Sequence, residues 1–105
     1  MESARTVPLQ SGTTPSNDAI ATADATVFTL NPGEVGFIQN LDTDPLAVKL
    51  GASATTTSFS MILQAGTAAS DGTGGFTYIT DYTGAVSVKA MTGTASYIAW
   101  KRALS

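Results

Sequence analysis

The side chains of this chain that could take part in chemistry are few, and most of them are aspartates. Histidine and cysteine are both absent, which removes Ser-His-Asp and Cys-His catalysis and the usual ligands of transition metals. Asp42 and Asp44 are spaced to ligate Ca²⁺ through oxygen, and Asp71 and Asp81 could form a glycosidase pair. However, Asp44 precedes Pro45 without EF-hand spacing, which is ordinary turn chemistry, and nothing indicates a groove. We therefore predict no enzymatic activity, no metal and no cofactor.

A glycine-rich segment, Gly72-Thr73-Gly74-Gly75, has some likeness to a phosphate-binding loop. A P-loop needs a lysine and a helix directly after its glycines, and this segment has neither. It lies in a Gly/Ala/Ser/Thr loop over residues 65–75, which exceeds the usual connection of about 4–6 residues and is therefore expected to be mobile or functional. Asp71 and Gly74 are its candidate contact residues, because small residues let a partner backbone come close.

The charge of the chain is sparse. Only 12% of residues are charged, about half the usual quarter, and solubility must rest on hydroxyl groups instead. This composition is common in viral coat proteins and secreted adhesive β domains. The net charge of −3 and the scattered Lys and Arg residues predict no binding to nucleic acid. No apolar stretch approaches the ~20 residues of a membrane span, and the start has no signal-peptide pattern, so we expect synthesis in the cytoplasm and no membrane partner.

From residue 25 onward, short β-patterned runs alternate with turn signals. In residues 46–50 the apolar side chains Leu46, Val48 and Leu50 alternate with Lys49, as in a half-buried strand. Asn31-Pro32-Gly33 suits a type II turn. Strands are predicted at residues 26–30, 34–40, 46–50, 59–63, 76–80, 86–89 and 97–101. Seven strands, or eight if the N-terminal segment pairs, predict an all-β antiparallel sandwich of the jelly-roll type.

Residues 1–24 differ from the rest, with several turn residues and little to bury. We expect an extended polar arm over residues 1–24 and a β-sandwich domain over residues 25–105. The arm is either a frayed terminus or a segment that becomes ordered against a neighbour. In the second case Arg5, Val7, Pro8 and Leu9 are the expected contacts with that neighbour.

The aromatic side chains are candidates for either the core or a contact surface. The four phenylalanines are expected in the core. Tyr78 is expected at the core rim with its hydroxyl in water. Trp100 belongs either to the core or to an interface hot spot or sugar-stacking platform. Tyr82, in a turn with Asp81 and Gly84, is expected to be the most exposed aromatic and a further contact candidate.

Several runs bring a known family to mind: residues 34–41 (EVGFIQNL), 46–51 (LAVKLG), 62–67 (ILQAGT) and 81–88 (DYTGAVSV), together with the glycine loop. Over about residues 25–100 the chain resembles the small structural proteins of tailed bacteriophages. The resemblance implies a capsid decoration or cement protein, a β-sandwich that binds the major capsid protein as a homotrimer and stabilises the shell. Its expected location is the capsid surface of the virion.

Two other functions are consistent with the same residues. One is a tail, neck or fibre subunit that contacts a host glycan or protein through the 65–75 loop and Tyr82 or Trp100. The other is a free-standing carbohydrate-binding or adhesive module, which would need an export signal that the sequence does not show.

Overall fold

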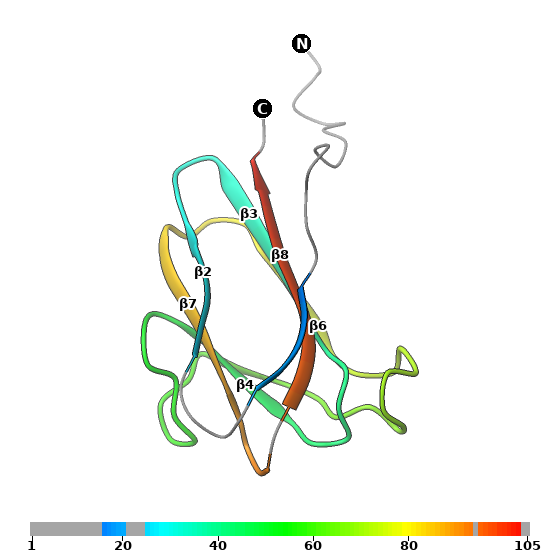
Figure 1. The fold of residues 1–105 in the computed structure, drawn as a ribbon. Coiled ribbons are helices and arrows are strands. Elements are labelled where there is room, and N and C mark those ends of the chain that lie inside the picture. The colour runs from blue at the N-terminus through cyan, green and yellow to red at the C-terminus, as the bar shows by residue number, and fades with distance from the viewer. Residues whose placement is uncertain (1–15, 21–24, 94, 104–105) are drawn as a thin grey trace.

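The computed structural model describes residues 16–20, 25–93 and 95–103, which form an all-β domain (Figure 1). Its eight strands are β1 (Ser16–Ile20), β2 (Ala25–Leu30), β3 (Glu34–Asn40), β4 (Leu46–Leu50), β5 (Met61–Leu63), β6 (Phe76–Ile79), β7 (Gly84–Ala90) and β8 (Ala95–Ala103). The predicted strands are therefore present, with small shifts at their ends.

The strands form two antiparallel sheets, with the orders β1-β8-β3-β6 and β2-β7-β4-β5. The first strand pairs with the last, the second with the seventh, the third with the sixth and the fourth with the fifth. This is the connectivity of a jelly roll, in which one long hairpin folds over into two packed sheets. The structure thus confirms the predicted antiparallel sandwich of the jelly-roll type.

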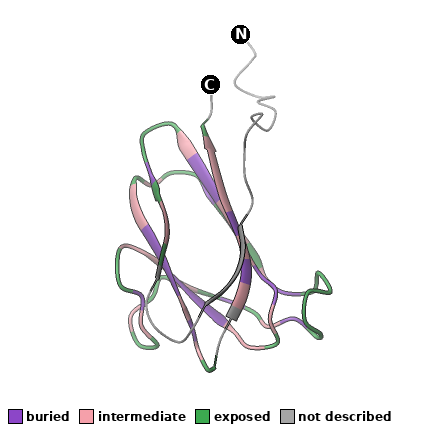
Figure 2. Ribbon diagram, viewed as in Figure 1, coloured by how far each residue is buried: buried purple, intermediate pink, exposed green. Residues whose placement is uncertain are grey.

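The core lies between the two sheets, along the middle of the strands (Figure 2). In β4 the side chains of Leu46 and Val48 are fully buried, while Leu50 is only half-buried. The largest fully buried apolar side chains are Leu30, Ile38, Leu46, Val48, Val86 and Val88. Burying each of these contributes about 1.5–3 kcal/mol, and in a chain without disulfides this term is the main source of stability.

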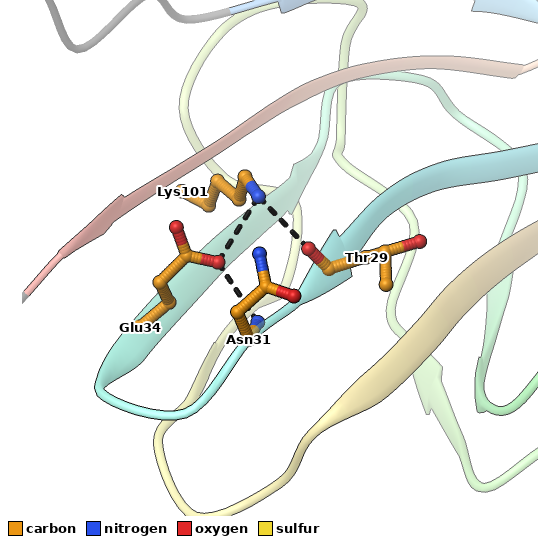
Figure 3. Close-up of polar contacts among 4 residues, drawn as sticks. All are labelled: Thr29, Asn31, Glu34 and Lys101. Carbon is orange, nitrogen blue, oxygen red and sulfur yellow. Dashed lines mark hydrogen bonds and ion pairs between the residues drawn. The ribbon is translucent and has the colours of Figure 1, made fainter.

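At one end of the sandwich a polar cluster ties the sheets together (Figure 3). The predicted type II turn is present, because Glu34 N donates to Asn31 O at 3.0 Å and Gly33 has a φ of 84°. The Glu34 carboxylate accepts from Asn31 N at 2.8 Å and from Lys101 Nζ at 3.0 Å. Lys101 also donates to Thr29 O at 2.9 Å. These bonds join β2 of one sheet to β3 and β8 of the other.

Strand boundaries differ from the prediction by one or two residues at β2 and at β5 to β8, and part of the N-terminal segment is also a strand. Ser16–Ile20 pairs with β8, so part of the segment expected as an arm is the edge strand β1. β5 begins at Met61 rather than at residue 59, because Ser60 N donates to Val48 O at 2.7 Å from outside the regular ladder. β7 begins at Gly84, which was expected in a turn. The proposed arm contacts Arg5, Val7, Pro8 and Leu9 lie outside the described residues.

Candidate functional site

The outer face of the β1-β8-β3-β6 sheet carries four aromatic side chains on three adjacent strands, which we call the aromatic patch: Phe37, Phe76, Tyr78 and Trp100. Phe37 lies at its centre, opposite Tyr78 of β6 on one side and Trp100 of β8 on the other. Ile38, the next residue in β3, is fully buried in the core. Because successive strand residues point to opposite faces, Phe37 and its two partners point away from the core.

The rings of the patch contact one another. The ring centroid of Phe37 lies 5.3 Å from that of Trp100, with a stacked angle of 22°, and 5.0 Å from that of Tyr78. Phe76 lies 5.9 Å from Phe37 and 6.4 Å from Tyr78, in an edge-on orientation to Tyr78. These separations fall in the favourable range for aromatic pairs, about 4.5–7 Å. The patch is therefore ordered by its own contacts before any partner arrives.

Exposure is unequal within the patch. Phe76 is 60% exposed and Tyr78 is 57% exposed, whereas Phe37 and Trp100 are half-buried. Single exposed apolar residues are common, but a contiguous exposed group is typical of an interaction surface. Phe37 and Trp100 thus form the base of the patch, and Phe76 and Tyr78 present the surface that a partner would contact.

The outer face of the other sheet is covered in part by the chain itself. Ser87 of β7 points outward between the buried residues Val86 and Val88, yet it is fully buried. Its hydroxyl accepts a hydrogen bond from Ala54 N at 2.9 Å and donates one to Gly51 O at 2.8 Å. The loop that follows β4 therefore lies against this face, which leaves the two outer faces of the sandwich chemically different.

The 65–75 loop, which the sequence predicted to be mobile or functional, is held by the carboxylate of Asp71. Thr73 donates to it through its backbone N–H at 2.9 Å and through its hydroxyl at 2.5 Å. The Thr67 hydroxyl donates to the other carboxylate oxygen at 2.8 Å. These bonds, led by those from Thr73, lower the pKa of Asp71 to about 2. Asp71 is exposed, as a contact residue must be. However, its carboxylate oxygens already accept hydrogen bonds from Thr67 and Thr73 of the same loop.

Gly74, the other candidate contact in this loop, is buried. A Cβ at this position would overlap the Asn40 carbonyl, so glycine is needed for close packing of the loop on β3. Asn40 itself is fully buried, and its side-chain amide donates to Asp44 O at 2.7 Å and to Gln64 O at 3.2 Å. The Asn40 side-chain oxygen accepts from Asp42 N at 3.0 Å. Gly74 and Asn40 thus have a packing role.

The structure corrects the expectations for several aromatic residues. Tyr82 is not the most exposed aromatic, because it packs against the core and its hydroxyl donates to Ala85 O at 2.8 Å. Phe37, Phe59 and Phe76 are not core residues: Phe59 is 40% exposed, and Phe37 and Phe76 lie on the outer face. Trp100 also lies on that face rather than in the core. Tyr78 also lies on that face, far more exposed than a core-rim position would be. The missed signal is in residues 35–38, where apolar side chains occupy both faces of one strand.

In the part of the chain that the structure describes, no three Asp or Glu side chains come together as potential metal ligands. Within the same residues, no helix has the length and apolar character needed to cross a membrane. Comparison with protein-family models, with curated proteins and with solved structures found no match for this chain.

Proposed function

We propose that this protein is a capsid decoration protein, which binds the outer surface of a tailed-phage head and reinforces the shell. Its partner is the major capsid protein, and the aromatic patch is the docking surface. The observation that carries the proposal is the exposure of Phe76 and Tyr78 within a preordered group of four rings. The sparse charge of the chain and its resemblance to small phage structural proteins support the same function.

The chemistry of the patch suits a protein partner better than a reaction. It contains hydrocarbon rings, one indole and one phenol, with neither a nucleophile nor an acid–base pair at neutral pH. Tyr and Trp are the residues most often found at interface hot spots, because they bury a large area and keep a polar group at the edge. The proposed function is therefore attachment without catalysis.

The size of the patch sets how strongly one copy can bind. An aromatic side chain buries about 150–250 Å² in total, so the exposed parts of Phe76 and Tyr78 offer roughly 200–300 Å² together. At about 25 cal/mol per Å² this supplies roughly 5–7 kcal/mol, which is comparable to the cost of association, about 4–15 kcal/mol. The patch therefore needs supporting contacts, such as those of a many-copy assembly on a shell.

The copy number of the protein in purified virions tests the proposed location. Quantitative mass spectrometry would compare the chain with the major shell protein. A decoration protein is expected at a copy number comparable to that of the shell protein. A copy number far below it would contradict decoration and would place the protein in the tail or neck.

A second candidate is a tail or fibre subunit that contacts a host glycan, and the exposed ring of Tyr78 beside Phe76 favours it. The near-parallel stacking of Phe37 and Trp100 weighs against it, because each ring covers one face of the other that a sugar would need. Trp100 is the only tryptophan of the chain, so its fluorescence reports on this surface. Saturable quenching of Trp100 fluorescence by a host polysaccharide, lost in Tyr78→Ala, would favour the glycan function. Unchanged fluorescence across a panel of host polysaccharides would exclude those glycans as ligands.

A further inference from the structure

Strand β6 forms an open edge of the β1-β8-β3-β6 sheet. Among the described strands it pairs with β3 alone. Edge strands of monomeric proteins are usually protected by charge, proline, a bulge or very short length. Both edge strands of the other sheet have such a feature: β2 has a register shift between Thr26 and Phe28, and β5 has only three residues. The sequence of β6, FTYI, has no charge, no proline and four residues of high β propensity.

The backbone groups of β6 that β3 does not use can be identified from the ladder between the two strands. Asn40 N donates to Gly75 O at 2.9 Å, in register with the pairs that follow. In an antiparallel ladder, hydrogen-bonded and non-bonded pairs alternate, so the backbone groups of Thr77 face β3. Those of Phe76 and Tyr78 face the open edge. In agreement, the Thr77 hydroxyl donates to the Tyr78 carbonyl at 3.3 Å, a carbonyl that β3 does not use.

We propose that β6 pairs in antiparallel fashion with β6 of a second copy of this chain, about a two-fold axis at Thr77. This pairing is a different contact from the homotrimer that the resemblance implies. In this register each Phe76 forms a hydrogen-bonded pair with Tyr78 of the second copy, and the two Thr77 residues face each other as a non-bonded pair. Residues opposite each other in a ladder point to the same face of the sheet, and this register places the outward-facing side chains of the two copies opposite one another. It also gives the open-edge backbone groups of Phe76 and Tyr78 hydrogen-bond partners, and for the Tyr78 carbonyl this is a second donor beside the Thr77 hydroxyl.

A second copy fits this edge because the edge is self-complementary. No residue of β6 is charged, so two chains of net charge −3 meet without like charges at the seam. Phe76 and Tyr78 pack edge-on within one chain, and the proposed register places the same two side-chain types opposite each other across the axis. The two-fold axis runs perpendicular to the sheet, so both aromatic patches point the same way and merge into one surface.

The contact area predicts a weak dimer. A four-residue strand with two half-exposed rings buries less than the ~1,200 Å² of a standard stable interface. We therefore expect a dissociation constant of roughly 0.1–1 mM, so that pairing matters where copies are concentrated on a common surface. The pairing is expected on any surface that concentrates the chain, whatever its chemistry.

Cysteine cross-linking tests the register directly, because the natural chain has no cysteine. Non-bonded antiparallel pairs have Cα atoms about 4.5 Å apart, within the range of a disulfide. Thr77→Cys should therefore give a covalent dimer under mild oxidation. The control is Ile62→Cys in β5, at the edge of the other sheet and 41% exposed. Dimer formation at least tenfold faster for T77C is the expected result, and equal rates would overturn the proposal.

Sedimentation velocity tests the pairing without a covalent bond. The wild-type chain should shift from monomer to dimer as its concentration rises to about 1 mM, following the expected affinity. Thr77→Lys brings two like charges together at the axis and should keep the chain monomeric, whereas Ile62→Lys should behave as the wild type. A wild-type monomer throughout, or unchanged dimerisation of T77K, would overturn the proposal. If T77K does not fold, the cross-linking rates of Thr77→Cys and Ile62→Cys still test the proposed pairing.

Discussion

Buried polar side chains hold the loops of this sandwich in place. Asn40 is fully buried, and its amide joins the turn at Asp44 to the loop that begins at Gln64. Ser87 does the same for the loop at Ala54. A buried polar group is stabilising only when its hydrogen bonds are made, so each of these residues fixes one arrangement of its loop.

Replacing Asn40 by alanine should destabilise the fold strongly. The change leaves buried carbonyl groups and the Asp42 N–H without their partner, and each such loss costs about 1–3 kcal/mol. We expect the free energy of unfolding to fall by about 2–4 kcal/mol in urea titrations. The neighbouring Gln39→Ala, which removes one long hydrogen bond to Gly74, should cost under about 1 kcal/mol. Equal effects of the two variants would contradict the role given to Asn40.

Acid should loosen the 65–75 loop through Asp71. The hydrogen bonds from Thr73 and Thr67 lower the pKa of this carboxyl from 3.8 to about 2. A lowered pKa means that its stabilising contribution is complete above pH ~4 and is lost as pH falls toward ~2. Exchange of the Thr73 amide proton should become faster over that range, after correction for intrinsic rates. Asp71→Asn should lack this step, and an unchanged profile in the wild type would count against the loop geometry.

At the scale of the elements, the two sheets meet closely at Gly36. The ring of Phe28 from β2 lies against Gly36 of β3, and a Cβ built on this glycine would come within 2.5–2.7 Å of two ring carbons. Real Cβ atoms do not approach so closely, so any larger residue must displace the ring. This contact is one place where the separation of the sheets depends on a single residue.

Gly36→Ala should therefore be destabilising although alanine is the smallest change available. Overpacking of this kind costs about 1–3 kcal/mol. Shortening the opposing side chain with Phe28→Leu in the same protein should recover part of that loss, which a double-mutant cycle in urea would measure. Strictly additive effects of the two changes would show that the ring and the glycine do not constrain each other.

The strand pattern was largely predictable, because alternation and turn residues are local properties. Residues 34–40 and 46–50 were predicted with the observed boundaries, and the type II turn at Gly33 follows from Pro32 and Gly33 together. The sequence alone does not decide whether Ser16–Ile20 pairs, because its partner strand β8 lies about 80 residues away in the chain. Long-range pairing is decided by packing that local residue types do not encode.

The candidate site was only partly predictable. Trp100 was recognised as a possible interface residue, but Phe37 and Phe76 were assigned to the core because apolar side chains are usually buried. When a strand has apolar residues on both faces, one face packs against the other sheet and the second is exposed. The sequence does not say which face is which. Conversely, Tyr82 was expected in water, but its hydroxyl reaches the Ala85 carbonyl and the ring packs inward.

At the scale of the whole molecule, the sandwich has two unlike outer faces. A loop anchored by Ser87 covers part of one, and the aromatic patch occupies the other. A protein that attaches to a large surface needs such a difference, because it must present one side to its partner and the other to solvent. The proposed decoration function assigns the patch to the shell and the loop-covered face to water.

The most direct test removes the exposed rings and measures binding to phage shells that lack this protein. Phe76→Ser with Tyr78→Ser deletes the exposed half of the patch. The matched control, Phe59→Ser with Ile62→Ser, deletes two further large apolar side chains, which are 40% and 41% exposed. Loss of two hot-spot residues at about 2 kcal/mol each predicts binding weakened by roughly 100-fold or more, with the control near wild type. Equal binding of both double variants, each shown to be folded, would contradict the proposal that the aromatic patch binds the shell.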